Sequence, residues 1–266
     1  MVIKIPDIVN NLCIVGDVHG SWDKIEYHIR HFKVKNTAFI FCGDVGLGFE
    51  KLSHYTDNVI PKSSKTLKKY NCYWYWIRGN HDNPDIFNNQ FINTKYIKTI
   101  PDYTILQFND KNILCIGGGI SVDRYSRKNY NSLSIVDYIK WHNCSYEEAE
   151  KKARKCYWEN EAPIYQSKVN EKIDIICSHS APSFCFPSFK GSFVLDWAKY
   201  DEELLPDLNK ERAVFDAIYE DYKDSLTYWY YGHFHKSNFE IINNTKFRLL
   251  NIGEIFQHVT DDNYSL

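Results

Sequence analysis

Residues 73–82, which read YWYWIRGNHD, decide the fold of this chain. Five aromatic and aliphatic residues lead into a cation, a glycine and three polar side chains. An apolar run that stops at a glycine predicts a buried strand followed by a loop. Loops that a rigid scaffold holds in place commonly carry reactive side chains. The stretch therefore predicts a strand over residues 73–77 and a functional loop at Asn80, His81 and Asp82.

Four further segments repeat this arrangement along the chain. In each, an apolar run leads into a cluster that carries Asp or His. The clusters are 16-GDVHG-20, 43-GDVG-46, 178-SHSAP-182 and 232-GHFH-235. A single buried Asp or His often does no more than satisfy backbone hydrogen-bonding groups. Five such clusters in chain order instead predict one shared metal site.

The candidate ligands of this site offer oxygen and nitrogen atoms and no thiolate. They are Asp17, His19, Asp44, Asn80, His179, His233 and His235. Such a set is typical of divalent metal ions; we expect Mn, with Fe, Zn, Ni and Mg as alternatives. Seven ligands are too many for one ion and fit two ions that share a bridging carboxylate. A water between two ions about 4 Å apart becomes a hydroxide near neutral pH, which suits an in-line displacement.

The composition narrows the partners and the compartment. The chain has 266 residues, a formal net charge of −2 and a sequence pI of about 6.5, so nucleic acid is not an expected partner. It has no stretch of 18 apolar residues and no apolar N-terminal signal, so no membrane association is expected. The eight cysteines are scattered and form no C-x-x-C pair. These features predict a cytoplasmic protein with reduced thiols.

Periodicity predicts an α/β protein with a single domain over residues 1–266. Apolar runs predict strands at residues 12–15, 38–42, 73–77, 103–108, 113–116, 173–177, 226–231, 239–242 and 247–252. Helical spacing predicts helices at residues 21–32 and 206–222, with weaker patterns over 50–70 and 131–160. The late hairpins make the sheets mixed. The polar segment 131–156, with a capping box at Ser145, is expected to be a helical insertion beside the site, and residues 183–199 a long functional loop.

The clusters GDVHG, GDVG, RGNHD, SHSAP and GHFH resemble, in order, the motifs of the calcineurin-like metallophosphoesterase superfamily. They run from residue 16 to residue 235, so the resemblance spans nearly the whole chain. It implies a four-layer α/β/β/α sandwich of two mixed sheets flanked by helices, with a dimetal centre at the strand ends. It also implies that Asp44 bridges two metals. One metal would then be held by Asp17, His19 and His235, and the other by Asn80, His179 and His233. His81 matches the family histidine that contacts the substrate phosphate or protonates the leaving group.

The motifs mix features of two branches of that superfamily. Protein phosphatases follow the bridging Asp with Val-Asp-Arg-Gly, where this chain has 46-GLGF-49, so the carboxylate that orients His81 and one phosphate-binding arginine are missing. Asp82 is the nearest replacement for that carboxylate. The GHFH cluster resembles phosphodiesterases, whereas Arg78 before Gly-Asn-His resembles protein phosphatases and dinucleoside-tetraphosphate hydrolases.

We expect dimetal-dependent hydrolysis of phosphoesters by attack of a metal-bridging hydroxide, on a small molecule or a phosphoprotein. Phosphomonoesters are favoured because Arg78 and Arg124 would place two guanidinium groups on the phosphate beside Asn80. His81, Arg78 and Asp82 form the expected catalytic set, and Glu161 is expected to face solvent. One alternative is a phosphodiesterase that acts on cyclic nucleotides or nucleic acid; another is a non-catalytic binding module. The sequence leaves the oligomeric state open.

Overall fold

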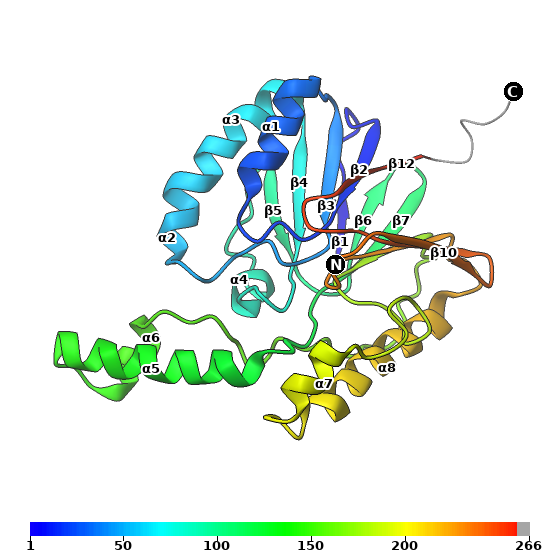
Figure 1. The fold of residues 1–266 in the computed structure, drawn as a ribbon. Helices are drawn as coiled ribbons and strands as arrows, with labels where there is room; N and C mark the ends of the chain where they lie inside the picture. The colour runs from blue at the N-terminus through cyan, green and yellow to red at the C-terminus, as the bar shows by residue number, and fades with distance from the viewer. Residues whose placement is uncertain (260–266) are drawn as a thin grey trace, which may run out of the picture.

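The computed structural model describes residues 1–259 and shows two β-sheets packed face to face with helices on both outer faces (Figure 1). This is the four-layer α/β/β/α arrangement with two mixed sheets, as predicted. None of the helices within residues 1–259 is long and apolar enough to span a bilayer. The sheet order places the strand ends that carry the candidate ligands at one edge of the sandwich.

The first sheet has five strands within the described residues, in the order β12-β2-β3-β4-β5. Its parallel strands are β2 (Asn11–Val15), β3 (Thr37–Phe41), β4 (Tyr73–Ile77) and β5 (Ile97–Ile100), and β12 (Ile255–His258) runs antiparallel to β2. Because β2, β3 and β4 are parallel neighbours, their carboxyl ends lie side by side. The loops that follow carry Asp17, Asp44 and Asn80, which brings these three residues together.

The second sheet has seven strands within the same residues, in the order β1-β6-β7-β8-β9-β11-β10. They are β1 (Val2–Lys4), β6 (Thr104–Phe108), β7 (Lys111–Ile116), β8 (Ile175–Ser178), β9 (Tyr228–Tyr231), β11 (Thr245–Leu249) and β10 (Asn238–Ile242). Strands β7, β8 and β9 are parallel. His179 directly follows β8, and His233 lies just beyond β9, so both histidines reach the same edge as the ligands of the first sheet.

Alternation along each strand divides the apolar side chains among three core layers. In β4, Tyr73, Tyr75 and Ile77 face the space between the sheets, while Trp74 and Trp76 face the outer helices. Helices α1 (Trp22–Phe32) and α3 (Ile60–Tyr70) cover the five-stranded sheet, and α8 (Leu204–Tyr222) covers the seven-stranded sheet. Burial of each large apolar side chain in these three core layers contributes roughly 1.5–3 kcal/mol to the free energy of unfolding. The sheet edge with the ligands therefore rests on a rigid base.

The remaining helices surround that edge. They are α2 (Leu52–His54), α4 (Pro84–Asn88), α5 (Arg124–His142), α6 (Tyr146–Lys152) and α7 (Ser192–Ala198). Helix α2 continues into α3 through a π-helical turn (Tyr55–Val59). Helices α5 and α6 pack against each other and project from the body (Figure 1). Ser145 caps α6, since its Oγ accepts from the Glu148 N–H. That residues 131–156 are an insertion into a single domain stays a prediction.

Two kinds of element were missed from the sequence. Strands β1, β5 and β12 were not predicted, and all three are short strands at the edges of their sheets. An edge strand has a single hydrogen-bonded neighbour and few core contacts, so its hydrophobic pattern is weak. Helix α7 lies inside the segment 183–199 that was predicted to be a loop. Helix α5 begins at Arg124, seven residues before the expected insertion.

Candidate metal centre

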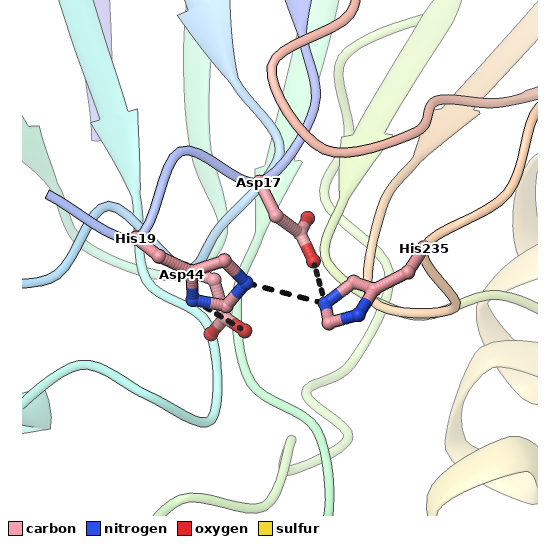
Figure 2. A group of neighbouring side chains, drawn as sticks. All are labelled: Asp17, His19, Asp44 and His235. Carbon is pink, nitrogen blue, oxygen red and sulfur yellow. Dashed lines mark hydrogen bonds and ion pairs between the residues drawn. The ribbon is translucent and has the colours of Figure 1, made fainter. Parts of the chain in front are cut away.

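Four of the candidate ligands form a compact group at the sheet edge, shown in Figure 2. One ligand atom from each of Asp17, His19, Asp44 and His235 lies within 4.8 Å of the other three. The Nε2 atom of His235 is 3.2 Å from His19 Nε2 and 3.2 Å from Asp17 Oδ2. His19 Nδ1 lies 3.9 Å from Asp44 Oδ2. Two carboxylates and two imidazoles thus converge on one small volume.

A second group adjoins the first through Asp44. His179 Nε2 is 2.8 Å from Asn80 Oδ1 and 3.4 Å from Asp44 Oδ1. The ring of His233 lies beside that of His179, with 4.8 Å between centroids. The two carboxylate oxygens of Asp44 therefore face different groups, Oδ2 toward His19 and Oδ1 toward His179. A carboxylate placed in this way is suited to bridge two ions.

The hydrogen bonds of the second group leave lone pairs that converge on a place where a cation could bind. The Nδ1 atom of His179 lies 2.7 Å from the Cys42 carbonyl oxygen, so Nδ1 carries the proton and donates it there. The Asn80 amide donates through Nδ2 to Ser121 Oγ at 2.8 Å, which turns Oδ1 inward. The Nε2 lone pair of His179 then faces acceptor oxygens of Asn80 and Asp44 with no proton between them. Such a convergence of lone pairs is stabilised by a divalent ion.

Burial keeps the imidazoles of His179 and His233 neutral and disfavours the charged form of Asp44. It lowers the pKa of His179 to about 4 and also lowers the pKa of His233 well below its usual value. Burial, followed by repulsion from Asp17 and Asp82, raises the pKa of Asp44 well above its usual value. A metal ion binds neutral imidazole and ionised carboxylate, so it would offset both of these costs.

The backbone at the centre adopts conformations that few sequences tolerate. Four ligands have φ in the left-handed region, namely His19 at 45°, Asp44 at 48°, His233 at 69° and His235 at 50°. Such strain persists where surrounding structure enforces it and is typical of functional sites. Two glycines allow close approach to the carboxylates. A Cβ on Gly79 would lie 2.0 Å from Asp44 Oδ1, and one on Gly232 would lie 2.2 Å from Asp17 Oδ1.

Comparison with known proteins agrees with this geometry. The sequence profile described as calcineurin-like phosphoesterase matches residues 11–237, which is most of the chain. The chain belongs to the calcineurin-like phosphoesterase family. It is therefore a metal-dependent hydrolase of a family that binds a dimetal centre, and the expectation of an enzyme is confirmed.

Two solved structures that resemble this phosphoesterase do so at low sequence identity. A phosphopantetheinyl hydrolase from Mycobacterium tuberculosis has 11% sequence identity and a TM-score of 0.49, over 96% of this chain and 98% of that one. A dimetal phosphatase from Danio rerio has 12% identity and a TM-score of 0.45, over 92% of this chain and 88% of that one. No curated protein matches the sequence. The family assignment rests on the sequence profile.

His81 of the phosphoesterase lies beside the metal ligands with its ring 5.3 Å from that of His19. Its backbone N–H donates to Asp44 Oδ1 at 2.8 Å, which fixes the loop. Arg127 Nη2 lies 3.4 Å from His81 Nε2. Burial, and then the charge of Arg127, lower the pKa of His81 to about 2. The imidazole is thus neutral in the metal-free protein, with a guanidinium next to it.

Arg127 was not identified as a candidate site residue from the sequence. It lies on α5, one helical turn after Arg124, with Nε donating to Asp123 at 2.7 Å and Nη1 to the Cys156 carbonyl at 3.1 Å. These bonds aim Nη2 at His81. The only sequence signal was the spacing from Arg124, since a residue three positions along a helix lies on a neighbouring part of its surface.

Arg78 and Arg124 do not face the ligands as expected. Arg78 donates from Nε and Nη2 to Asp102 at 3.0 and 2.8 Å and from Nη1 to the Glu161 carbonyl at 2.7 Å. A Cβ on Gly118 would lie 2.8 Å from both Arg78 Nη atoms, so the glycine turn accommodates Arg78. Arg124 donates to Asp201 at 2.6 Å and to Asp207 at 2.8 Å. Phosphate binding by these two residues has no support, because carboxylates and carbonyls already take their N–H groups.

Asp82 holds two ligand loops together and has no described contact with the His81 ring. Its fully buried carboxylate accepts four backbone N–H bonds, from Val45, Gly46 and Leu47 on one loop and from Gly79 on the other. The distances run from 2.7 to 3.0 Å. This geometry makes Asp82 a positioning residue, in place of the catalytic partner predicted for His81.

Glu161 is buried, so the expectation that it faces solvent was wrong. It is 1% exposed and accepts from the Ser121 N–H at 2.8 Å and from Ser121 Oγ at 2.6 Å. Ser121 Oγ in turn accepts from Asn80. Burial raises the pKa of Glu161 to about 8. The chain Glu161–Ser121–Asn80 therefore sets the orientation of a candidate ligand from two residues that no motif marks.

Proposed function

We propose that this enzyme hydrolyses phosphomonoesters with two divalent metal ions, of which manganese is our first choice. We assign Asp17, His19 and His235 to one ion, Asn80, His179 and His233 to the other, and Asp44 to both. The observation that carries this proposal is the placement of the Asp44 oxygens toward the two separate groups. Bound there, the ions would polarise the phosphoester and activate water. The remaining steps fall to side chains next to the cluster.

We assign substrate contacts to His81 and Arg127. Nε and Nη1 of Arg127 are engaged by Asp123 and the Cys156 carbonyl, so its Nη2 group, which points toward His81, is the one left to form a charge-assisted bond with a non-bridging phosphate oxygen. His81 lies between Arg127 and the candidate metal ligands, so we place it next to the leaving oxygen of a bound substrate. The negative charge of a bound phosphate raises the pKa of His81 from its low value in the free protein, which favours proton donation to that oxygen.

Arg127 supports a monoester because a dianion needs more positive charge around phosphorus than a monoanion does. The test compares kcat/KM for p-nitrophenyl phosphate and bis-p-nitrophenyl phosphate at equal metal loading. We expect the monoester to be the better substrate. Arg127→Ala should lower its kcat/KM by roughly 10- to 100-fold, the worth of one charge-assisted hydrogen bond, and should affect the diester less. The matched control is Arg154→Ala, because Arg154 is an exposed arginine just after α6 that pairs with Glu50 in the segment before α2.

One observation favours a phosphodiesterase as the second candidate. Arg78, Arg124 and Arg127 are all held in ion pairs, with Asp102, Asp201 and Asp123, which lowers the positive charge available to a phosphate dianion. A better rate with the diester, together with equal rates for the wild type and Arg127→Ala, would decide for this candidate. Cyclic nucleotides would then be the first substrates to assay.

We further propose that the enzyme works in the reducing cytoplasm. All eight cysteines are free thiols, and six of them are buried, where they act as small apolar residues. The proposal predicts that activity is unchanged by millimolar reductant. Inactivation by reductant would indicate a functional disulfide and overturn it.

A further inference from the structure

A cavity of about 720 Å³ opens directly on the metal ligands. One end is lined by cluster residues, including Asp44, His81 and His235. The other end is formed by the segment 183–194, which leads into α7, and by the amino-terminal half of α8. We call it the aromatic cavity. Its volume is that of a small-molecule site, and any group that fills it touches the reacting centre.

The walls of the aromatic cavity are mostly apolar. Four phenylalanine rings line it, from Phe186, Phe189, Phe193 and Phe234, and Val194 and Leu208 complete the apolar wall. Phe189 and Phe193 are 72% and 62% exposed, so their rings stay in water when the cavity is empty. Isolated exposed rings are common, but several that converge on a cavity next to a metal cluster mark a binding surface.

Several polar groups in the wall already have partners within the protein, although the buried Nε of Arg212 has none among the described residues. Arg212 donates to the Cys185 carbonyl at 2.8 Å and lies over the Phe234 ring at 5.1 Å. Asp216 accepts from the Ser183 N–H, and Glu211 from the Ile120 N–H. A sugar or polyol would need a partner for each of its hydroxyl groups, and these three side chains are already partly engaged. An apolar group needs none.

Lys236 adds a feature that favours an aromatic ring. Its Nζ lies 5.6 Å from the centroid of the Phe186 ring, so a cation and a ring already stack at the wall. A second ring that enters beside them gains edge or face contact with Phe186 and attraction to the ammonium group. Lys190 lies at the outer part of the wall and donates to Asn209.

We propose that the aromatic cavity binds the leaving group of the substrate, and that this group is an apolar alcohol or phenol carrying an aromatic ring. The inference rests on the proposed phosphoester hydrolysis at the adjoining cluster. Hydrolysis breaks the bond between phosphorus and the alcohol oxygen and forms one between phosphorus and the oxygen of water. The alcohol oxygen gains its proton through His81, and inorganic phosphate is the other product.

The test uses two monoesters whose reacting bonds are alike, 2-phenylethyl phosphate and ethyl phosphate, with the metal-loaded enzyme. Burial of the phenyl ring should raise kcat/KM on the order of 10- to 100-fold over ethyl phosphate. Replacing two exposed rings, in Phe189→Ser/Phe193→Ser, should reduce that ratio at least several-fold. The control is Trp141→Ser, an 85% exposed aromatic residue on α5, which should keep the full ratio.

A binding measurement separates this inference from the proposed function. The non-hydrolysable 2-phenylethylphosphonate should bind the wild type at least 10-fold more tightly than ethylphosphonate does, and the double variant should lose this preference. Preferential binding without turnover of either ester would support the aromatic cavity as a binding site for the ring and overturn the phosphomonoesterase proposal. Turnover of both esters at equal kcat/KM would overturn the proposed leaving-group site. A kcat/KM ratio that is unchanged in the double variant would overturn it too. No turnover and no preference in binding would overturn both.

Discussion

Replacement of Asp82 by asparagine tests whether this carboxylate holds the ligand loops. Oδ1 accepts from the Gly46 and Leu47 N–H groups, and Oδ2 accepts from those of Val45 and Gly79. An asparagine keeps one oxygen and turns an NH₂ group toward the other two N–H groups. Two buried donors then lack an acceptor, at about 1–3 kcal/mol each. The expected loss in unfolding free energy is therefore about 2–6 kcal/mol.

The lower half of that range is the better expectation. Burial raises the pKa of Asp82 to about 6, so the native carboxylate itself carries a desolvation cost that asparagine avoids. Asp82→Ala would leave all four donors without an acceptor. Its cost, roughly 4–12 kcal/mol, is comparable to the whole stability of a typical domain. We expect Asp82→Asn to fold and Asp82→Ala to fail.

The assay is urea unfolding of the metal-free protein at pH 8, followed by circular dichroism. Metal must be removed because an ion that binds the folded state alone would add to its stability. Asp224→Asn, an exposed carboxylate beyond the end of α8, serves as control and should stay within about 0.5 kcal/mol of the wild type. If Asp82→Asn also stays within that margin but loses activity, the carboxylate acts in catalysis and our reasoning is refuted.

Three further predictions concern other parts of the centre. Gly232→Ala should weaken metal affinity at least 10-fold on titration calorimetry, because the added Cβ would displace Asp17. The control is Gly191→Ala, whose added Cβ would meet no atom within 4 Å and which should bind metal as the wild type does. Equal affinities of the two variants would show that the loop at Gly232 adjusts to the added Cβ. His81→Ala should lower kcat by roughly 10²–10⁴-fold with metal content unchanged on elemental analysis, and a parallel loss of metal would make His81 a ligand. Glu161 holds a proton in the folded state between its usual pKa of 4.5 and about 8 but loses it on unfolding, so its own contribution to wild-type stability should fall by about 1.4 kcal/mol per pH unit across that window. Glu161→Gln should lack this slope in metal-free urea unfolding at pH 6 and pH 8, and an unchanged slope would assign it to another group.

The convergence of the candidate metal ligands was predictable because each of these residues follows a strand in the sequence. Once β2, β3 and β4 are parallel, the residues after them must meet at one edge, whatever the details of packing. The left-handed backbone at ligands such as Asp44 was not predictable in the same way. It follows from contacts between loops, which no local pattern reveals.

The arginines show that closeness along the sequence does not predict which residue a side chain contacts. Arg78 directly precedes the Asn80 loop, yet its side chain turns beneath Gly118 toward Asp102, a partner 24 positions away. Arg127 reaches His81 only because α5 begins early and passes the centre. Glu161 lies among polar residues and becomes buried by bonding to Ser121, 40 positions earlier. Side-chain direction is set by such distant partners, and spacing along the chain does not encode it.

The number of metal ions per chain tests the central claim most directly. Protein loaded with manganese and freed of excess metal should contain two ions per chain by elemental analysis. Asp44→Asn should hold one or fewer, because both groups share that carboxylate, and Asp224→Asn should still hold two. A wild-type value of one or fewer after full loading would contradict the two-metal account.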